Sequence, residues 1–515
     1  MTADPTGPDP ALADPPAVAL YRTALAGVHV HEFPITALDH TGVPVWVAAA
    51  WLDGELTSGI GYGETDGRAR VGAWGELVEG VFVHRLRSLP ARRATYRALA
   101  DAGEPAVDPR RLRLPIGTDY TDETERLWVQ ARRFAPGDAR DGEPVWVLLD
   151  EAVAHTYNLP DGYRPLYTPI TNGLGAGETL ERAVGHGLLE LVQRDGNSVG
   201  YRALDRGVVV DLDDVQDAET RRWLGRFAEA GIALMVKLAD TPFGMADVYV
   251  EGREADLDRL PHPMALTGCG EAAHPDRERA LRKALLEYGA SRVRKRFAHS
   301  RLEDIEAYLP ADYVAAVRAH PPGVEESRSL EAVREWSRVP ALEALRRLDG
   351  TWFRDCRHVP FSSLPTSDVA DEPAALAAEV ASRMAEAGLD VLVVEVSPPG
   401  APVRVVKVVV PGLEVETMTY GRIGPRNIRR LLDRIADGDR IVHPDIVGLG
   451  RPPAEAQAVV MAPDDEAALG GPAWARLDLL EEALGPLYAM YREPPEHAVS
   501  FADARDAAGE RDAAA

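Results

Sequence analysis

The chain contains only two cysteines in 515 residues, Cys269 and Cys356. Two distant cysteines provide neither a disulfide framework nor a cysteine-rich metal site, so a reducing cytoplasm is the expected setting. No run of about twenty apolar residues occurs, which argues against a membrane-spanning helix. The first twenty residues lack a basic start followed by an apolar core, so we expect no secretory signal.

Basic residues are also in short supply. The sequence has 57 Lys and Arg against 82 Asp and Glu, which gives a formal net charge of −25. This balance argues against a nucleic acid or an anionic membrane surface as the partner. Hydrophobic residues make up 45% of the chain, enough for a sizeable core. At roughly 100–200 residues per domain, the length allows three domains or one large α/β domain.

Strand-like apolar runs alternate with helical patterns, which predicts an α/β fold. The expected strands are 43–51, 144–150, 232–240 and 246–252, with a hairpin at 391–414. The expected helices are 69–80, 179–195, 276–296, 341–348, 372–387 and 427–437.

The expected organisation has four parts. Residues 1–17, rich in Pro, Asp and Ala, are predicted to be a disordered tail. The main domain is expected at 18–440 and contains a polar, helix-prone insertion at about 302–364. A helical extension at 441–500 and a second disordered tail at 501–515 complete the prediction.

The most informative feature is a duplicated stretch. Residues 59–78 read GIGYGETDGRARVGAWGELV and residues 173–192 read GLGAGETLERAVGHGLLELV, with ten identities in twenty ungapped positions. Chance at typical residue frequencies gives about one or two. A weaker third copy is ERALRKALLEYGASR. In all three copies a glutamate stands seven residues after an Arg-Ala pair: Glu76, Glu190 and Glu287. The repeat predicts related helices that bring acids to one centre.

The first copy carries a second acid, Glu79, where the second copy has Gln193. A three-residue spacing on a helix places Glu76 and Glu79 on one face, about 5–6 Å apart at Cβ. Their neighbours are small and apolar, where two like charges are costly unless a cation lies between them. Mg²⁺ prefers oxygen ligands and bridges carboxylates to phosphates. Glu76, Glu79 and Glu190 are therefore candidate metal ligands; the alternative is that they are solvent-facing acids of ordinary helices.

Alternating glycines precede both main copies: Gly59, Gly61, Gly63, Gly173, Gly175 and Gly177. Glycine loops allow a phosphate to approach backbone N–H groups at a helix start. Alternating glycines also pack in crowded strands, and the sequence does not decide between the two. The chain has no Walker A motif. Arg194 and Arg292 offer guanidinium groups that suit phosphate, but arginines in such a setting are more often salt-bridge partners for neighbouring acids.

Four segments together resemble the YcaO superfamily over roughly residues 59–424. They are the two copies of the repeat, GCGEAAHPDRERALRKALLEYGASR and VLVVEVSPPGAPVRVVKVVVPGLE. The resemblance implies an α/β fold with an internal pseudo-symmetric duplication and mixed sheets flanked by helices. It also implies ATP and Mg²⁺ as cofactors, bound without a P-loop, and phosphorylation of a peptide backbone amide oxygen. A thiazoline or oxazoline, a thioamide or an amidine would follow, in the biosynthesis of ribosomally made peptide natural products.

By this resemblance, Glu76 and Glu79 match the first metal-binding pair, and Glu190 matches the first acid of the second pair. The implied nucleotide-binding residues are Glu76, Glu79, Glu190, Gln193, Arg194, Glu287, Arg292 and Lys407. The implied substrate is a precursor peptide. A leader-binding or companion modification protein and a homodimer are compatible with the resemblance, and no catalytic residue is assigned.

Seven positions depart from the superfamily pattern: Tyr62, Gly72, Gly80, Glu178, Arg182, Gln193 and Ala290. These departures remove nucleotide and metal contacts. They motivate a second hypothesis, in which the chain is a catalytically degenerate YcaO-like protein that binds a precursor peptide or scaffolds a partner enzyme.

Overall fold

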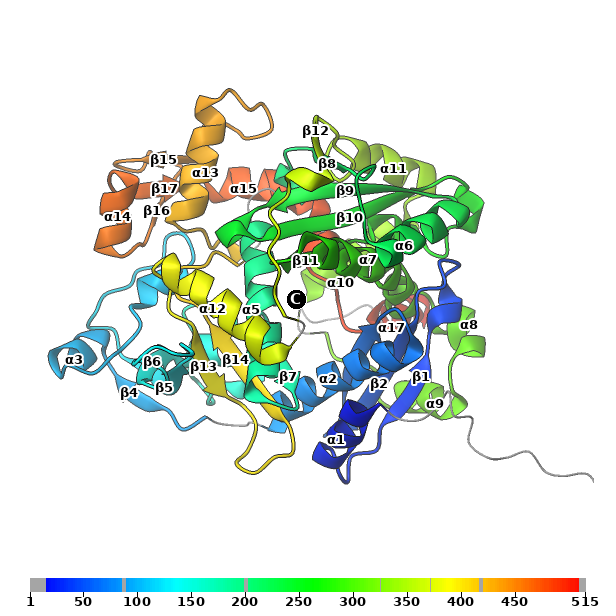
Figure 1. The fold of residues 1–515 in the computed structure, drawn as a ribbon, viewed down its shortest axis with the longest axis horizontal. Coiled ribbons are helices and arrows are strands. Elements are labelled where there is room, and N and C mark those ends of the chain that lie inside the picture. Colours follow the sequence, from blue (N-terminus) through cyan, green and yellow to red (C-terminus); the bar gives the residue numbers. More distant parts are fainter. Residues whose placement is uncertain are drawn as a thin grey trace, which may run out of the picture.

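The computed structural model describes residues 15–85, 89–198, 202–324, 326–370, 372–415 and 420–508. Helices and four sheets alternate in this part of the chain, so the predicted α/β class is confirmed (Figure 1). The predicted strands and the hairpin are present, and the hairpin strands pair antiparallel from Leu392 with Val409 to Glu395 with Val406. None of the helices in these residues is both long enough and apolar enough to cross a bilayer.

The sheets bring together strands that are far apart in the sequence. The first has the order β1-β2-β3, with β1 His31–Pro34, β2 Val45–Leu52 and β3 Glu55–Tyr62. The second has the order β11-β10-β9-β8-β12, with β8 Val208–Asp211, β9 Ile232–Asp240, β10 Ala246–Glu254, β11 Gly270–His274 and β12 Arg357–Pro360. The third has the order β4-β5-β13-β14-β7, with β4 Arg92–Ala94, β5 Arg126–Arg133, β7 Leu174–Gly177, β13 Leu392–Glu395 and β14 Arg404–Val409; β6 Pro144–Leu148 pairs with β5. The fourth is small, with β15 Val447–Leu449, β16 Gln457–Val459 and β17 Ala473–Ala475.

Three long helices lie between these sheets in the middle of the molecule: α2 Asp66–Arg85, α5 Leu180–Gly196 and α7 Arg277–His299 (Figure 1). The Thr179 side chain caps α5 by accepting from the Arg182 N–H, and Asp276 caps α7 by accepting from the Glu278 N–H. The other helices are α1 Pro16–Ala24, α3 Tyr96–Asp101, α4 Leu149–Ala152, α6 Ala218–Glu229, α8 Leu302–Ile305, α9 Ala311–Ala319, α10 Ser327–Arg338, α11 Ala341–Asp349, α12 Pro373–Glu386, α13 Pro425–Ala436, α14 Pro463–Leu469, α15 Leu477–Leu484, α16 Tyr488–Tyr491 and α17 Ala498–Ala508.

Glycines let each long helix lie directly on the strand before it. A Cβ atom added to Gly61, Gly175 or Gly270 would lie 2.1, 2.1 or 1.9 Å from a carbonyl oxygen of the following helix. Any side chain at these positions would push the helix off its strand. Of the two interpretations that the sequence left open for these glycines, the structure supports close packing in a crowded strand.

The three strand–helix units form a closed ring. Helix α2 packs on its own strand β3 and also contacts β7, the strand of the second unit. Helix α5 packs on β7 and contacts β11, the strand of the third unit. Helix α7 packs on β11 and contacts β3, which returns to the first unit. Each helix therefore presents side chains to the next unit as well as to its own.

The ends of the chain differ from the prediction. Residues 441–500 are not only helical, because β15, β16 and β17 form a sheet there. Residues 498–508 form helix α17, where a disordered tail from 501 was expected. Ala502 is buried against the hydrophobic core beside α10, which stabilises this helix. Helix α1 begins at Pro16, within the predicted N-terminal tail; residues 1–14 and 509–515 lie outside the described residues.

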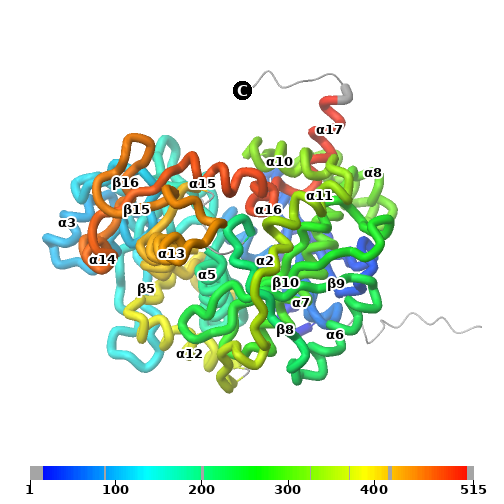
Figure 2. Tube along the Cα trace, turned by 90° about the horizontal axis from the view of Figure 1, so that it is seen from above, coloured from blue at the N-terminus to red at the C-terminus, as the bar shows by residue number. Residues whose placement is uncertain are grey.

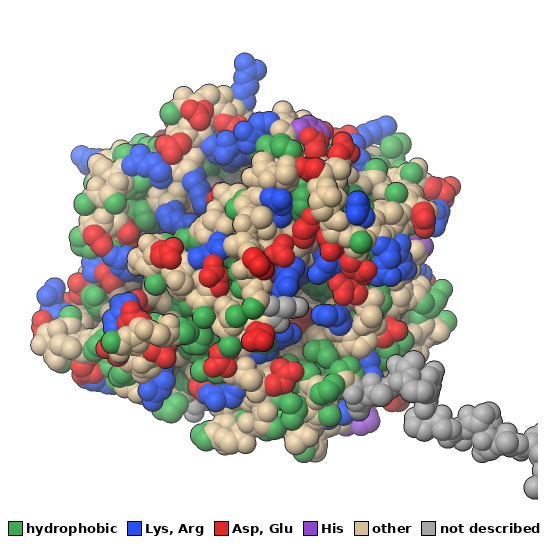
Figure 3. Space-filling view, viewed as in Figure 1, with side chains coloured by type: hydrophobic (Ala, Val, Ile, Leu, Met, Phe, Trp, Pro, Cys, Tyr) green, Lys and Arg blue, Asp and Glu red, His purple; other side chains and the backbone are tan. Residues whose placement is uncertain are grey.

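The predicted insertion is helical for most of its length, from α8 to α11, but it ends in strand β12. Strand β12 pairs parallel with β8, so this segment also completes the five-stranded sheet. Figure 2 shows the chain after α14 crossing from the small sheet to the region of α10 and α17. On the face drawn in Figure 3, acidic and basic side chains are interspersed.

Candidate functional site

Two carboxylates on α2 face the contact between the first and second units. Glu76 Oε2 accepts a hydrogen bond of 3.0 Å from the Ile60 N–H of β3, and Glu79 accepts one from the Ala176 N–H of β7. The protein around Glu76 desolvates its carboxyl and raises its pKa to about 7, although part of the side chain stays accessible. Burial, followed by repulsion from Glu76 and Glu190, raises the pKa of Glu79 well above its ordinary value.

Glu190 on α5 holds the equivalent place in the second unit. Its Oε2 accepts a hydrogen bond of 2.9 Å from the Gly173 N–H at the start of β7. Arg194, one turn later, lies 3.8 Å from Glu190 Oε1. Thus Glu76, Glu79 and Glu190 each use one interaction with a strand N–H and keep further lone pairs for other ligands.

Gln193 points to a different carboxylate, Glu271 of β11. Gln193 Nε2 and Arg194 Nη1 each lie 3.2 Å from Glu271 Oε2. Asn197 Nδ2 donates to the same oxygen at 2.9 Å, and Arg202 lies 3.3 Å from the other oxygen. Glu271, a buried carboxylate that orients Gln193 and Arg194, was not predicted from the sequence. Its signal was present, because Glu271 directly follows the packing glycine of the third motif.

Glu287 on α7 faces strand β3 of the first unit. The Tyr62 hydroxyl donates to Glu287 Oε2 at 2.8 Å. Burial and the negative Glu287 raise the pKa of Tyr62 well above its ordinary value, so Tyr62 stays a proton donor. Burial also raises the pKa of Glu287, and Lys283, one turn earlier on α7, opposes that shift. Tyr62, one of the departures from the superfamily pattern, therefore fixes the third acid.

Arg292 is not part of this acid cluster, which corrects the assignment made from the sequence. Its side chain is fully buried and forms ion pairs with Asp39 at 3.0 Å and with Glu254 at 2.8 Å. Five residues along a helix turn a side chain by about 140°, so Arg292 leaves the face that Glu287 occupies. The arginine on the Glu287 face is Arg294, seven residues on, and its positive charge lowers the pKa of Glu76.

Lys407 lies in β14, next to β7. Its Nζ donates to the Ile170 carbonyl at 2.5 Å, and its side chain is buried. Burial lowers the Lys407 pKa to about 8, while the nearby Glu151 and Glu190 carboxylates oppose the shift. Lys407 is therefore mostly charged at neutral pH, on the Glu190 side of the cluster.

The chemistry of the acid cluster suits Mg²⁺. In the described part of the chain, no cationic side chain lies within ion-pair distance of Glu76 or Glu79, and both have raised pKa values. Glu76, Glu79 and Glu190 are not among the groups of ligand atoms of the described residues that lie close enough together to hold an ion by themselves. Mg²⁺ is usually held by one or two carboxylates together with phosphate oxygens and water. The donor set fits ions shared with a polyphosphate.

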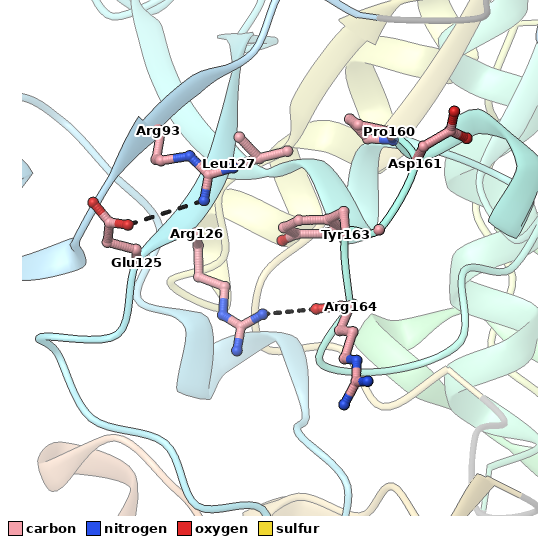
Figure 4. A pocket seen from close by; sticks show the side chains of 9 residues that line it. Arg93, Glu125, Arg126, Leu127, Pro160, Asp161, Tyr163 and Arg164 are labelled. Atoms are coloured by element: carbon pink, nitrogen blue, oxygen red, sulfur yellow. Dashed lines mark hydrogen bonds and ion pairs between the residues drawn. The ribbon is translucent and has the colours of Figure 1, made fainter.

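A pocket of about 320 Å³ lies elsewhere, beside β4 and β5 (Figure 4). Three arginines line it, and two of them are already engaged: Arg93 with Glu125 at 4.0 Å and Arg126 with the Arg164 carbonyl at 2.9 Å. It contains none of the glutamates of the cluster. The pocket and the acid cluster are therefore separate features.

Nucleotide binding with Mg²⁺ is expected to weaken as the pH falls through about 7, the pKa of Glu76, because a protonated carboxyl is a poor ligand. In the absence of metal, the pH dependence of folding stability has the opposite sign. The folded protein binds the Glu76 proton more tightly than the unfolded chain does. This contribution to stability is therefore lost as the pH rises from about 4.5 through 7. Calorimetric titration and thermal unfolding at about pH 6 and 8 test both statements. Glu76→Gln is the control, because the nucleotide titrates equally in both proteins; identical pH profiles would contradict the assignment.

The site is thus an acidic α/β site in which three helices present oxygen ligands suited to a magnesium-bound polyphosphate. The sequence pattern of the YcaO cyclodehydratases, described as ATP- and Mg²⁺-binding, matches residues 60–414. The chain belongs to the YcaO family.

Individual proteins resemble this chain to different degrees. An uncharacterised protein of Methanothermobacter thermautotrophicus is 30% identical over 399 residues, which covers 76% of this chain and 91% of the relative. An uncharacterised protein in the tfuA 3' region of Rhizobium leguminosarum bv. trifolii is 26% identical over 296 residues, covering 56% of this chain and 61% of the relative. The solved structure of YcaO from Methanopyrus kandleri, bound with AMPPCP and Mg²⁺, has a similar fold, with a TM-score of 0.52 and 24% identity over 78% of this chain and 89% of that one.

Proposed function

We propose that this protein uses ATP and Mg²⁺ to phosphorylate a backbone amide oxygen of a precursor peptide, as a step toward an azoline, a thioamide or an amidine. The observation that carries the proposal is the ring of three helices with Glu76, Glu79, Glu190 and Glu287 directed to its contacts. The family membership supports it, and so do the desolvated, mutually repelling carboxylates, whose oxygens suit Mg²⁺ shared with phosphate. The proposed setting is a reducing cytoplasm, which the two distant cysteines favour, and a homodimer or a companion protein is compatible with the family membership. The matched strand–helix units support an internal duplication.

Carboxylates and cationic side chains of the cluster would bind the nucleotide together. Glu76 and Glu79 would supply oxygen ligands from α2, and Glu190 would supply them from α5. Arg194, oriented by Glu190 and Glu271, and the charged Lys407 would offset phosphate charge on the Glu190 side. ATP, when bound with Mg²⁺, supplies the phosphoryl group that turns the amide oxygen into a leaving group. Catalysis by this chain would then consist mainly of positioning and charge neutralisation.

A second candidate function is a degenerate YcaO-like protein that binds a precursor peptide or scaffolds a partner enzyme. One observation favours it: Gln193, at the position of the second acid, is buried and donates to Glu271. The second pair therefore keeps only one acid, Glu190. Gln193, which stands in place of the other acid, has its hydrogen-bond partner within the protein. A glutamate in place of Gln193 would face Glu271 and repel it.

Two measurements separate the candidates. An active enzyme is expected to release phosphate from ATP when a cognate precursor peptide is present, with a new mass on the peptide. The scaffold is expected to bind the peptide with no release of phosphate and no calorimetric signal for ATP with Mg²⁺. Tight, Glu76-dependent nucleotide binding would exclude the simple scaffold, and absent nucleotide binding would overturn the proposed enzyme.

A further inference from the structure

A second group of ligand-type side chains lies outside the acid cluster. His29, His31 and Asp312 offer atoms that all lie within 4.8 Å of one another. His31 Nδ1 lies 3.2 Å from Asp312 Oδ2, and the two imidazole rings are 4.7 Å apart at an interplanar angle of 82°. Two imidazoles and one carboxylate are a ligand set that zinc uses in proteins.

The local fold explains why these three side chains meet. His31 opens strand β1, and His29 precedes it by two residues, so the extended chain directs both side chains to one face. Asp312 lies in the first turn of α9, within the segment predicted as an insertion. Tyr313, the next residue on α9, packs on Phe33 of β1 with ring centroids 4.8 Å apart. This contact sets α9 beside the strand and delivers Asp312 to the histidines.

The central ligand is held in place and the outer two are accessible. His31 is buried, and its ring makes edge contacts with Trp51 at 5.4 Å and Tyr313 at 5.9 Å. His29 is exposed, and the Asp312 side chain is 70% exposed. A rigid buried ligand between two accessible ones leaves an entry path from solvent.

We propose that His29, His31 and Asp312 form a binding site for a divalent transition metal, with zinc as the preferred ion. Two ligands at about 2.0–2.2 Å from a tetrahedral zinc lie roughly 3.3 Å apart, close to the separation of His31 Nδ1 and Asp312 Oδ2. Water completes the coordination. The ion clamps α9 to β1 and so ties the inserted helices to the three-stranded sheet that supports α2.

The test uses the full-length protein, freed of metal with a chelator and titrated with Zn²⁺ in the presence of excess Mg²⁺ and ATP. The site is expected to take up about one equivalent of zinc and to raise the unfolding temperature, because an ion that binds only the folded state stabilises it. His29→Ala and Asp312→Asn change exposed side chains, so the fold is expected to remain intact. Each is expected to weaken zinc binding by at least about tenfold and to remove most of the thermal shift.

His358→Ala is the matched control. His358 also contacts carboxylates, Asp211 at 2.7 Å and Asp355 at 3.0 Å, but through opposite ring nitrogens, which cannot bind the same ion. This variant is expected to bind zinc as the wild type does. Zinc that stays bound in both His29→Ala and Asp312→Asn, or no zinc uptake by the wild type, would overturn the site. Zinc retained by the variants but lost in Glu76→Gln would assign the ion to the acid cluster instead.

Discussion

Replacing Glu76 by Gln is expected to lower ATP-dependent phosphate release by about 100-fold or more and to leave the fold intact. Gln has the same shape as Glu and accepts the same hydrogen bond from the Ile60 N–H, but it lacks the charge that Mg²⁺ requires. Without metal, the variant should be at least as stable as the wild type above pH 7, because it relieves the repulsion of Glu76 with Glu79 and Glu190. Steady-state phosphate release and thermal unfolding measure the two effects.

Glu181→Gln is the control for this prediction. Glu181 lies on α5 nine residues before Glu190, so it points to the opposite side of the helix, about 180° away. Its loss removes the same charge from the protein without touching the acid cluster, and activity should remain close to that of the wild type. Equal losses in Glu76→Gln and Glu181→Gln would show an effect of net charge. Unchanged activity in Glu76→Gln would remove the acid cluster from the proposed reaction.

Replacing Arg292 by Ala is expected to cost about 3–5 kcal/mol of the free energy of unfolding. The substitution leaves the buried carboxylates of Asp39 and Glu254 without their guanidinium partner. His40, beside both acids, compensates only when it is protonated. Urea denaturation measures the loss. Where Arg292→Ala yields too little folded protein, Arg292→Lys can be measured instead. Lysine keeps the positive charge but lacks the planar guanidinium, so the loss of unfolding free energy should be smaller than in Arg292→Ala.

Arg294→Ala provides the contrast, since Arg294 is on the same helix but its side chain is 49% exposed. We expect a change in unfolding free energy below about 1 kcal/mol together with weaker nucleotide binding, because Arg294 faces the acid cluster. If Arg292→Ala is instead stable but binds the nucleotide poorly, Arg292 is a residue of the nucleotide site after all. Equal destabilisation by both substitutions would contradict the different environments of the two arginines.

Much of the local structure could be predicted because it depends on short-range patterns. The helix start at Thr179 and the hairpin at 391–414 follow from capping residues, turn residues and hydrophobic periodicity, and the structure confirms them. The C-terminal part was predicted less well. Strands β15–β17 have three residues each, too few for a periodic signal, and α17 is stabilised by burial against α10, a contact that local sequence does not contain.

The order of the amino acids is enough to identify the acids of the site. The repeated spacing after each Arg-Ala pair identifies Glu76, Glu190 and Glu287 as equivalent positions, and the family follows from the motifs around them. The partners of these acids follow only from the folded arrangement of the three units. On α7, Arg294 and not Arg292 faces the acid cluster. Glu271 accepts hydrogen bonds from Gln193 and Arg194. Tyr62 of the first unit donates to Glu287 of the third unit. The physical reason is that helical spacing fixes which residues share a face, whereas the contact of one unit with the next depends on packing between segments far apart in the chain.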